Sequence, residues 1–206
     1  MRRQRPGKAR PRRLLDRPSV RHPLHACAGP GTRMSDAASW AQRAAQVGAQ
    51  AFDADEGLRR LAALWAGGRR PFDEASMARL APYLVFVRVA AGKRLIVQDE
   101  PGEFMVVVLE GTVVVEHQGA TTTARLAEIR PGDVLGEMSL LDAGPRLSDC
   151  RSTEPCVLAV LETSKLLALM NADAQLALML LAALARRLSL RLRQTSTRLS
   201  ALLGDA

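Results

Sequence analysis

The stretch PGDVLGEMSLLDAGPR, residues 131–146, decides the fold of this chain. It opens with Pro131-Gly132-Asp133, a combination typical of a tight turn, and continues with the short apolar run Val134-Leu135-Gly136. The letters MSLL that follow predict a single helical turn. Glu137 and Arg146 stand on either side of that apolar turn.

These residue types indicate a particular ligand chemistry. The first N–H groups of a helical turn have no partner within the helix and can bind an anion. The guanidinium of Arg146 can form two parallel hydrogen bonds to a phosphate. An ionised Glu137 can only accept hydrogen bonds, so a ligand hydroxyl suits it. Together the two residues indicate a sugar phosphate.

The sequence around this stretch predicts strands flanked by helices. Short β-branched runs begin at Val85 and alternate with glycine-containing turns about every ten residues, which is typical of a sandwich, jelly roll or barrel. Before them, helical patterns follow Ser35 or Asp36, then Asp53 or Asp55, then Asp73. After Thr163 the period is helical again, with a short helix over 164–170 and a long one over 173–203.

The long helix predicts a homodimer. Its apolar positions follow spacings of three and four residues, and such a seam stays in contact with a partner helix along its length. A helix packed only on its own barrel would explain the first half, but it leaves leucines among the arginines of the second half unexplained. We therefore expect a parallel dimer through this helix. The seam positions are Leu178, Leu181, Ala185, Leu188, Leu192, Thr195, Leu199 and Leu202.

The positive charge of the chain belongs to its first 33 residues. The net charge is +8, yet residues 1–33 carry ten basic residues and one acidic residue, and the remainder carries 19 basic and 20 acidic residues. We expect residues 1–33 to be a disordered basic leader. Because the composition changes at Met34, we interpret the leader as the product of a start site upstream of the true one. Phosphate-backbone binding by this leader is the alternative.

The remaining features predict a cytoplasmic, non-enzymatic protein. Three cysteines give no pairing pattern, which favours a reducing compartment. No apolar run reaches the roughly 20 residues that a membrane helix needs. No arrangement of a catalytic nucleophile or of an iron–sulfur cluster is evident. His22, His25 and Cys27 do not predict a metal site either, because they lie in the leader and lack a fourth ligand.

With its neighbours, the opening stretch resembles a known family. From Phe72 to about Gly204 the chain resembles the cyclic nucleotide-binding domain of the catabolite activator protein and of kinase regulatory subunits. The resemblance rests on PGDVLGEMSLLDAGPR, VVVLEGTVVV (residues 106–115) and CVLAVLETSKLLALM (residues 156–170). It implies an α+β fold, an antiparallel, jelly-roll-like β-roll of about eight strands with N-terminal helices and a long C-terminal helix.

The resemblance also implies which residues bind a cyclic mononucleotide, cAMP or cGMP. Glu137 would take the ribose 2′-hydroxyl and Arg146 the cyclic phosphate. Arg191 and Leu192 stand where the family contacts the base, although neither carries a hydroxyl. Leu147, which replaces a small or hydroxylic residue, and Asp149, an acid near the phosphate, depart from the family pattern. The full set of expected ligand contacts is Gly136, Glu137, Met138, Ser139, Arg146, Leu147 and Ser148.

We therefore predict a stand-alone sensor that reorients its C-terminal helix on binding cyclic nucleotide and acts on an unknown effector protein. Its parts are the leader (1–33), N-terminal helices (34–71) and the binding domain (72–206), with no cofactor and no metal. Two alternatives remain: a ligand-free dimeric scaffold with a degenerate pocket, and a transcriptional regulator without its own DNA-binding domain. Sequence-specific DNA binding is not expected, because the chain ends directly after the long helix.

Overall fold

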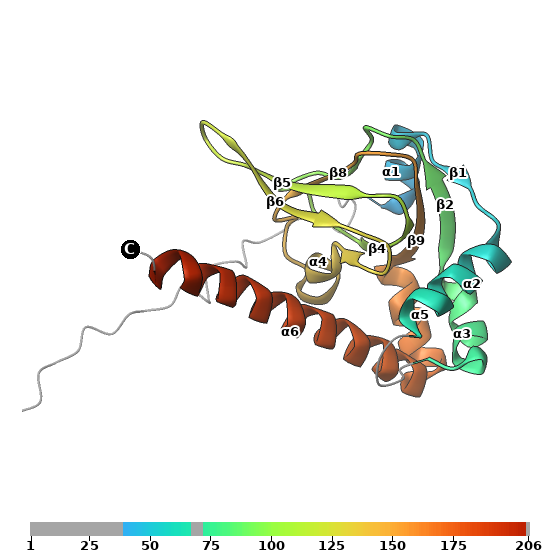
Figure 1. Cartoon of the computed structure of the whole chain (residues 1–206). Coiled ribbons are helices and arrows are strands. Elements are labelled where there is room, and N and C mark those ends of the chain that lie inside the picture. The colour runs from blue at the N-terminus through green and yellow to red at the C-terminus, as the bar shows by residue number, and fades with distance from the viewer. Residues whose placement is uncertain (1–38, 67–71, 205–206) are drawn as a thin grey trace, which may run out of the picture. The chain divides into compact units, whose positions relative to one another are not determined.

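A computed structural model describes residues 39–66 and 72–204, and in them two antiparallel sheets form the predicted β-roll (Figure 1). One sheet has five strands in the order β1-β2-β9-β4-β7, and the other has four in the order β3-β8-β5-β6. The strands are β1 (Gln50–Ala51), β2 (Val85–Val89), β3 (Arg94–Ile96), β4 (Phe104–Glu110), β5 (Val113–Gln118), β6 (Thr123–Ile129), β7 (Val134–Leu135), β8 (Asp149–Ser152) and β9 (Cys156–Glu162).

The predicted architecture is confirmed, with one strand more than the eight expected. The extra strand is β1, whose two residues pair with Arg88 and Val87 of β2. Its two residues lie between two helices, and a run this short carries no readable alternation of apolar and polar side chains. The N-terminal segment therefore joins the roll through a strand as well as through helices.

Several of the helices begin directly after a residue whose side chain caps them. Asp53 and Asp73 accept hydrogen bonds from the N–H groups of Glu56 and Ser76, at 2.8 Å each. The first helix begins after Ser39, and the predicted caps Ser35 and Asp36 lie outside the described residues. The helical elements are α1 (Trp40–Val47), α2 (Ala54–Trp65), α3 (Glu74–Leu80), the 3-10 turn η1 (Ala81–Tyr83), α4 (Glu137–Asp142), α5 (Thr163–Ala172) and α6 (Ala174–Gly204).

The long helix α6 runs along the roll and past α4, as Figure 1 shows, and two of its faces differ in burial. The face toward the roll is buried through Leu176, Ala177, Leu180, Ala183 and Leu184. The predicted seam lies largely elsewhere, because its members Leu178, Leu192 and Leu199 are more than half exposed. The side chain of Leu202 lies outside the described residues. The apolar seam is thus not used up by packing within the chain.

One contact fastens α6 to α2 across the edge of the roll. The carbonyl of Gly132 accepts hydrogen bonds from Trp65 Nε1 at 3.4 Å and from Arg187 Nε and Nη2 at 3.3 and 3.1 Å. The guanidinium of Arg187 also lies over the Trp65 ring, 4.7 Å from its centroid. The turn that leads into β7 therefore contacts both helices.

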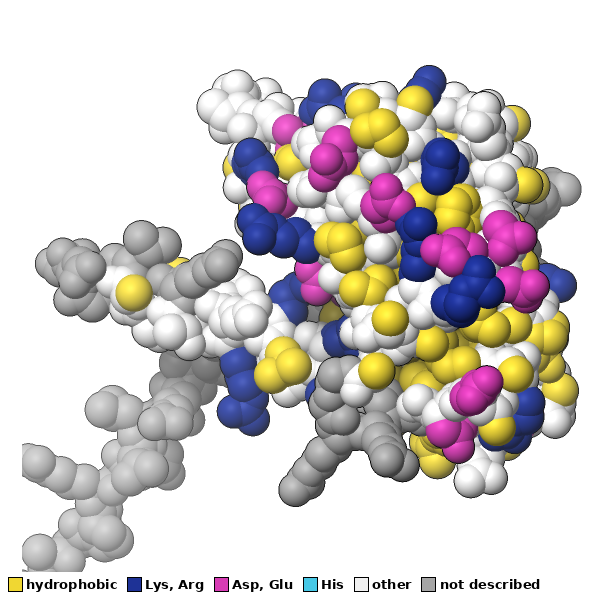
Figure 2. Space-filling model, turned by 45° about the vertical axis from the view of Figure 1, so that its right-hand side comes forward, with side chains coloured by type: hydrophobic (Ala, Val, Ile, Leu, Met, Phe, Trp, Pro, Cys, Tyr) yellow, Lys and Arg dark blue, Asp and Glu magenta, His cyan; other side chains and the backbone are white. Residues whose placement is uncertain are grey.

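Acidic and basic side chains are interspersed over the face drawn in Figure 2, with hydrophobic side chains between them. Several are paired, for example Arg60 with Glu110 and Arg151 with Glu116. The predicted leader, residues 1–33, lies outside the described residues. Among the described helices, none combines the length and hydropathy needed to cross a membrane.

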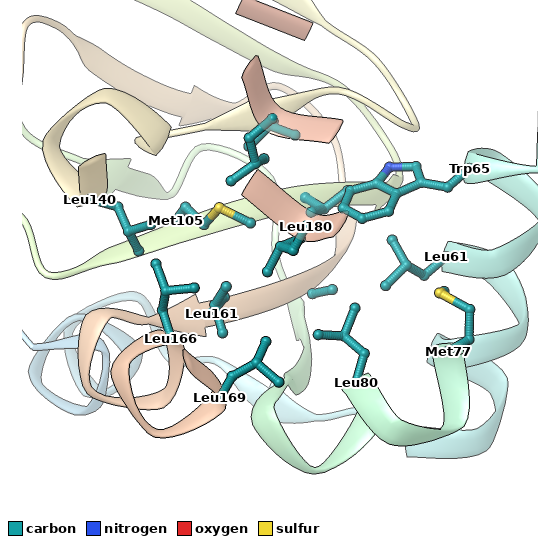
Figure 3. Packing of buried hydrophobic residues seen from close by; sticks show 14 of the residues in the cluster. Leu61, Trp65, Met77, Leu80, Met105, Leu140, Leu161, Leu166, Leu169 and Leu180 are labelled. Atoms are coloured by element: carbon teal, nitrogen blue, oxygen red, sulfur yellow. The ribbon is translucent and has the colours of Figure 1, made fainter. Parts of the chain in front are cut away.

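Two apolar clusters hold the elements together. The first lies between the five-stranded sheet and helices α2, α3, α5 and α6, where Leu61, Trp65 and Leu80 meet Met105, Leu161 and Leu180 (Figure 3). The second fills the roll between the two sheets and includes Trp40 of α1. Fully burying one such aliphatic side chain contributes about 1.5–3 kcal/mol. The roll is therefore a packed scaffold, and the residues of the opening stretch sit at its edge.

Candidate functional site

The β7–α4 corner is built around a glycine. Val134 and Leu135 pair with Val107 and Val106 of β4, which anchors the strand before the corner. Gly136 then adopts φ +74°, a conformation that L side chains rarely adopt, and α4 begins at the next residue. A Cβ at Gly136 would lie 2.5 Å from Nη1 of Arg146. Glycine is required here both by the backbone and by the arginine.

Arg146 lies buried against the start of β4, with 3% of its surface exposed. Its Nη1 donates to the carbonyl of Gly136 at 2.9 Å, and its Nη2 donates to the carbonyl of Phe104 at 2.6 Å. Its Cζ lies 4.7 Å from the centroid of the Phe104 ring. Gly102 also makes room for it, since a Cβ there would lie 2.0 Å from Nε. The side chain is held by backbone carbonyls, an aromatic ring and two glycines.

This guanidinium is buried without an acidic partner. Among the described residues, no carboxylate oxygen lies within 4.0 Å of its nitrogens, whereas ten other arginine–carboxylate contacts satisfy that limit. Burial lowers the pKa of Arg146 to about 10, so the group stays protonated at neutral pH. Burying an unpaired charge costs several kcal/mol. An anionic ligand would offset that cost.

Glu137, the first residue of α4, is also buried, with 5% of its surface exposed. Its Oε1 accepts a hydrogen bond from Nη1 of Arg191 on α6 at 2.9 Å. Nη2 of the same arginine donates to the carbonyl of Val134 at 3.0 Å. Burial raises the pKa of Glu137, and the charge of Arg191 opposes that rise. The carboxylate therefore links the β7–α4 corner to the long helix.

Glu137 and Arg146 line one shared cavity of about 740 Å³. Arg191 lines it as well, so the structure brings together eight of the nine residues predicted as ligand contacts. Leu192 is not among the lining residues, because its side chain is 67% exposed on another side of α6. The predicted residues that line the cavity are Gly136, Glu137, Met138, Ser139, Arg146, Leu147, Ser148 and Arg191.

Several lining residues were not predicted from the sequence. On α6 the cavity is lined by Gln194 and Thr195, the turn after Arg191. On the roll it is lined by apolar side chains of the four-stranded sheet, including Leu126 of β6, Ile96 of β3 and Cys150 of β8. The seam spacing had assigned Thr195 to a partner helix, and nothing in the spacing of β6 marks it as a cavity wall. Only the packing of α6 against the roll reveals them.

The two departures from the family pattern are both accommodated. Leu147 is 60% exposed, at the rim of the cavity. Asp149 is buried but points elsewhere, since its Oδ1 accepts from the N–H of Gln98 at 2.9 Å and its Oδ2 from Nε2 of Gln118 at 3.3 Å. Neither glutamine lines the cavity. The negative charge of Asp149 is thus turned away from the place of a bound anion.

The thiol of Cys150 is shielded by burial, and the carboxylate of Asp142 is engaged in a local hydrogen bond. Burial raises the pKa of the Cys150 thiol to about 12, so that the thiolate needed for nucleophilic attack is scarce at neutral pH. Asp142, the third acid of the opening stretch, caps its own turn by accepting from the N–H of Gly144 at 2.9 Å. In residues 39–66 and 72–204, no group of three His, Cys, Asp or Glu side chains could hold a metal ion. The arrangement suits binding of an anionic ligand that carries a hydroxyl.

Comparison with known proteins identifies the roll. The family model of the cyclic nucleotide-binding domain matches residues 86–173, which include Glu137 and Arg146. A cyclic nucleotide-binding domain from Methylobacillus flagellatus KT is 23% identical, with a TM-score of 0.69 over 73% of this chain and 86% of that one. This likeness confirms the fold.

Two regulators are more similar in sequence. The N-terminal domain of a transcriptional regulator from Streptomyces coelicolor A3(2) is 29% identical, with a TM-score of 0.53 over 69% of this chain and 94% of that one. The catabolite activator protein of Thermus thermophilus is 28% identical, with a TM-score of 0.54 over 68% of this chain and only 62% of its own length. Residues 86–173 therefore match the cyclic nucleotide-binding domain family, and the roll has the fold of solved members of that family, among them a catabolite activator protein.

Proposed function

We propose that this protein is a non-enzymatic sensor that binds a cyclic mononucleotide, cAMP or cGMP, in the cavity between α4 and α6. The observation that carries the proposal is the buried guanidinium of Arg146, which lines the cavity and has no carboxylate partner within residues 39–66 and 72–204. The cyclic phosphate supplies the missing negative charge, with hydrogen bonds from Arg146 and from N–H groups of the 136–139 turn and of Leu147 and Ser148.

The second polar contact of the ligand falls to Glu137. Its Oε1 is bound to Arg191, and its Oε2 remains available to accept a hydrogen bond from the ribose 2′-hydroxyl. A cavity of about 740 Å³ lies within the range of about 300–1,000 Å³ that small-molecule sites occupy. Its walls are partly apolar, which suits a purine. Arg191, Gln194 and Thr195 are the α6 residues available to the base.

The response to the ligand would pass through α6. Arg191 joins this helix to the carboxylate that the ligand must also use, so a bound nucleotide changes the contact that holds α6 against the corner. A shift of α6 would alter the exposed seam around Leu178, Leu192 and Leu199, through which we propose that two copies dimerise. The dimer would then present a different surface to an effector protein.

We place this sensor in the cytoplasm, where cyclic nucleotides are made and where thiols stay reduced. The support is that Cys150 and Cys156 are both free and buried.

Calorimetric titration with cAMP and with cGMP, at about 100 µM protein, tests the proposal because dissociation constants in the micromolar range are then measurable. We expect heat with at least one nucleotide, and a loss of about 100-fold or more in affinity for Arg146→Ala. Arg151→Ala is the matched control, since Arg151 also lies on the 145–152 segment but pairs with Glu116 away from the cavity. An absence of heat with both nucleotides would refute the proposal.

A ligand-free dimeric scaffold is the second candidate. The observation in its favour is that two carbonyls already accept hydrogen bonds from the Arg146 guanidinium. Thermal unfolding with and without nucleotide separates the two candidates. A sensor gains stability with rising ligand concentration and loses that gain in Arg146→Ala, whereas the unfolding temperature of a scaffold does not depend on nucleotide in either the parent or the variant.

A further inference from the structure

Helix α1 lies outside the segment that matches the family, yet it packs against Phe104, the residue that supports the guanidinium of Arg146. Its residues Trp40 and Arg43 are buried, with 4% and 6% of their surfaces exposed. The Trp40 ring meets the edge of the Phe104 ring, with centroids 5.2 Å apart and planes at 68°. Phe104 is the ring on which the guanidinium of Arg146 lies. One aromatic residue thus separates α1 from the guanidinium.

A second path from α1 to Arg146 runs through Glu100. The guanidinium of Arg43 forms an ion pair with the carboxylate of Glu100. The carbonyl of Glu100 accepts from the N–H of Arg146 at 2.9 Å, and the N–H of Asp99 donates to the carbonyl of Arg146 at 2.8 Å. The ion pair on α1 therefore belongs to the same short ladder that fixes the backbone of Arg146.

The ion pair between Arg43 and Glu100 also affects which charges are available to Arg146. Two carboxylates, those of Glu100 and Glu137, act on Arg146 through their charges, and the positive charge of Arg43 acts in the opposite sense. Each of these carboxylates is bound by a different arginine, Glu100 by Arg43 and Glu137 by Arg191. A carboxylate with its own partner competes poorly for a second guanidinium. Arg146 can therefore remain buried without an acidic partner while two carboxylates lie nearby.

We propose that Trp40 and Arg43 are positioning residues for Arg146: Trp40 fixes the aromatic ring under its guanidinium, and Arg43 occupies Glu100 so that Arg146 stays available to an anion. The proposal rests on the proposed function for its ligand, but the contacts themselves are present without one. Helix α1 thereby becomes a part of the binding domain, added to the roll on the side of the phosphate.

The test of Arg43 is a rescue experiment with cAMP. Arg43→Gln frees Glu100, which then competes with the phosphate for Arg146, and we expect an affinity loss of about three- to tenfold. Adding Glu100→Gln removes the competitor, and we expect the double variant to return to within about twofold of the parent. A double variant as weak as Arg43→Gln would overturn the proposal, because that result means that the ion pair matters only for packing.

The test of Trp40 compares a ligand with and without phosphate. Trp40→Leu should weaken cAMP binding about three- to tenfold and leave adenosine binding unchanged, while Trp40→Phe keeps the aromatic edge and the parent affinity. Leu61→Val, in the other apolar cluster, is the control for a general loss of stability. Equal losses for cAMP and adenosine would contradict the positioning role.

A ligand-free measurement separates this inference from the proposed function. The Nε–H signal of Arg146, assigned by its disappearance in Arg146→Lys, should exchange slowly with water in the parent, because the group is buried. We expect faster exchange in Trp40→Leu but not in Trp40→Phe. If the parent binds no nucleotide, the proposed function fails while this result still decides the positioning role: faster exchange supports it, and unchanged exchange refutes it.

Discussion

The two ends of the cavity bury opposite charges by different means. In the part of the chain that the structure describes, Arg146 has no acidic partner, and the carbonyls of Gly136 and Phe104 in the roll hold it. Glu137 has a partner, but Arg191 comes from α6, a separate element that packs onto the roll. The comparison teaches that the Arg146 end of the cavity, here called the rigid end, is held by residues of the roll alone, whereas the Glu137 end, here called the helix end, is completed by a separate helix.

The largest expected effect comes from closing the space at the rigid end. Gly136→Ala adds a Cβ 2.5 Å from Nη1 of Arg146 at a residue with φ +74°. We expect a loss of about 2–4 kcal/mol in the free energy of unfolding, together with loss of nucleotide binding. Chemical denaturation and calorimetry measure the two effects.

Gly92→Ala is the matched control for that change. Gly92 has nearly the same conformation, φ +76°, but a Cβ there meets nothing within 4 Å. We expect only the backbone strain, about 1 kcal/mol, and unchanged nucleotide affinity. Equal effects of the two substitutions would show that the contact with Arg146 is unimportant, and the rigid end would lose its distinction.

The next effect concerns the helix end and depends on pH. Arg191→Gln leaves the Glu137 carboxylate buried without its ion pair, and we expect a loss of about 1–2 kcal/mol at pH 7, since Arg191 is itself partly exposed. Burial already raises the pKa of Glu137 above its ordinary value, and removing Arg191 raises it further. The folded state therefore binds the proton of Glu137 more tightly than the unfolded state does.

The sign of the pH dependence follows from that difference in proton binding. A raised pKa in the folded state destabilises the protein above that pKa, and the penalty disappears as the pH falls through it toward the unfolded value. The difference in unfolding temperature between Arg191→Gln and the parent should thus be largest at neutral pH and shrink on acidification. Arg193→Gln, an exposed arginine on the same helix, should match the parent at every pH. A difference that grows in acid would contradict this account.

A smaller effect on folding, but a clear one on assembly, is expected along the seam of α6. Leu192→Glu places a charge at a 67% exposed position, so the fold of one chain should tolerate it while the proposed dimer weakens. Light scattering after size exclusion, over a range of concentrations, measures the mass. Leu190→Glu, at a 54% exposed leucine off the seam, should leave the dimer intact. Dissociation by both substitutions would show that the seam is wrongly placed.

The smallest effect is expected at Asp149. Its carboxylate accepts from the N–H of Gln98 and lies away from the cavity, and an asparagine retains one oxygen for that hydrogen bond. We expect Asp149→Asn to change nucleotide affinity less than about twofold. A tenfold gain in calorimetry would show instead that the acid opposes the phosphate and that the rigid end is less well shielded than described.

The sequence predicted the parts of this protein whose chemistry is local. Turn residues such as Pro131-Gly132-Asp133 and capping residues such as Asp73 act on their immediate neighbours. The elements that begin or end at these residues were therefore correctly placed. The family resemblance named Glu137 and Arg146 together, since both belong to a single continuous stretch, and the structure places both in the lining of one cavity.

The rest of the site depends on packing between distant segments. Trp40 contacts Phe104, and Arg191 reaches Glu137, across more than fifty residues of sequence in each case. No periodicity in one sequence shows which turn of α6 faces the cavity, so Gln194 was missed and Leu192 was named although it does not line it. The same limit hid the role of α1, whose pattern resembles that of any amphipathic helix.

The chain's two tryptophans lie where a structural change near the cavity would alter their fluorescence emission. Trp65 lies beneath the guanidinium of Arg187 on α6, and Trp40 lies behind the ring that supports Arg146. Indole emission is sensitive to nearby charge and to water, so departure of α6 would brighten or shift the emission of one tryptophan and leave the other unchanged. The protein thus carries two intrinsic optical reporters, one beside α6 and one behind Arg146, and needs no attached dye.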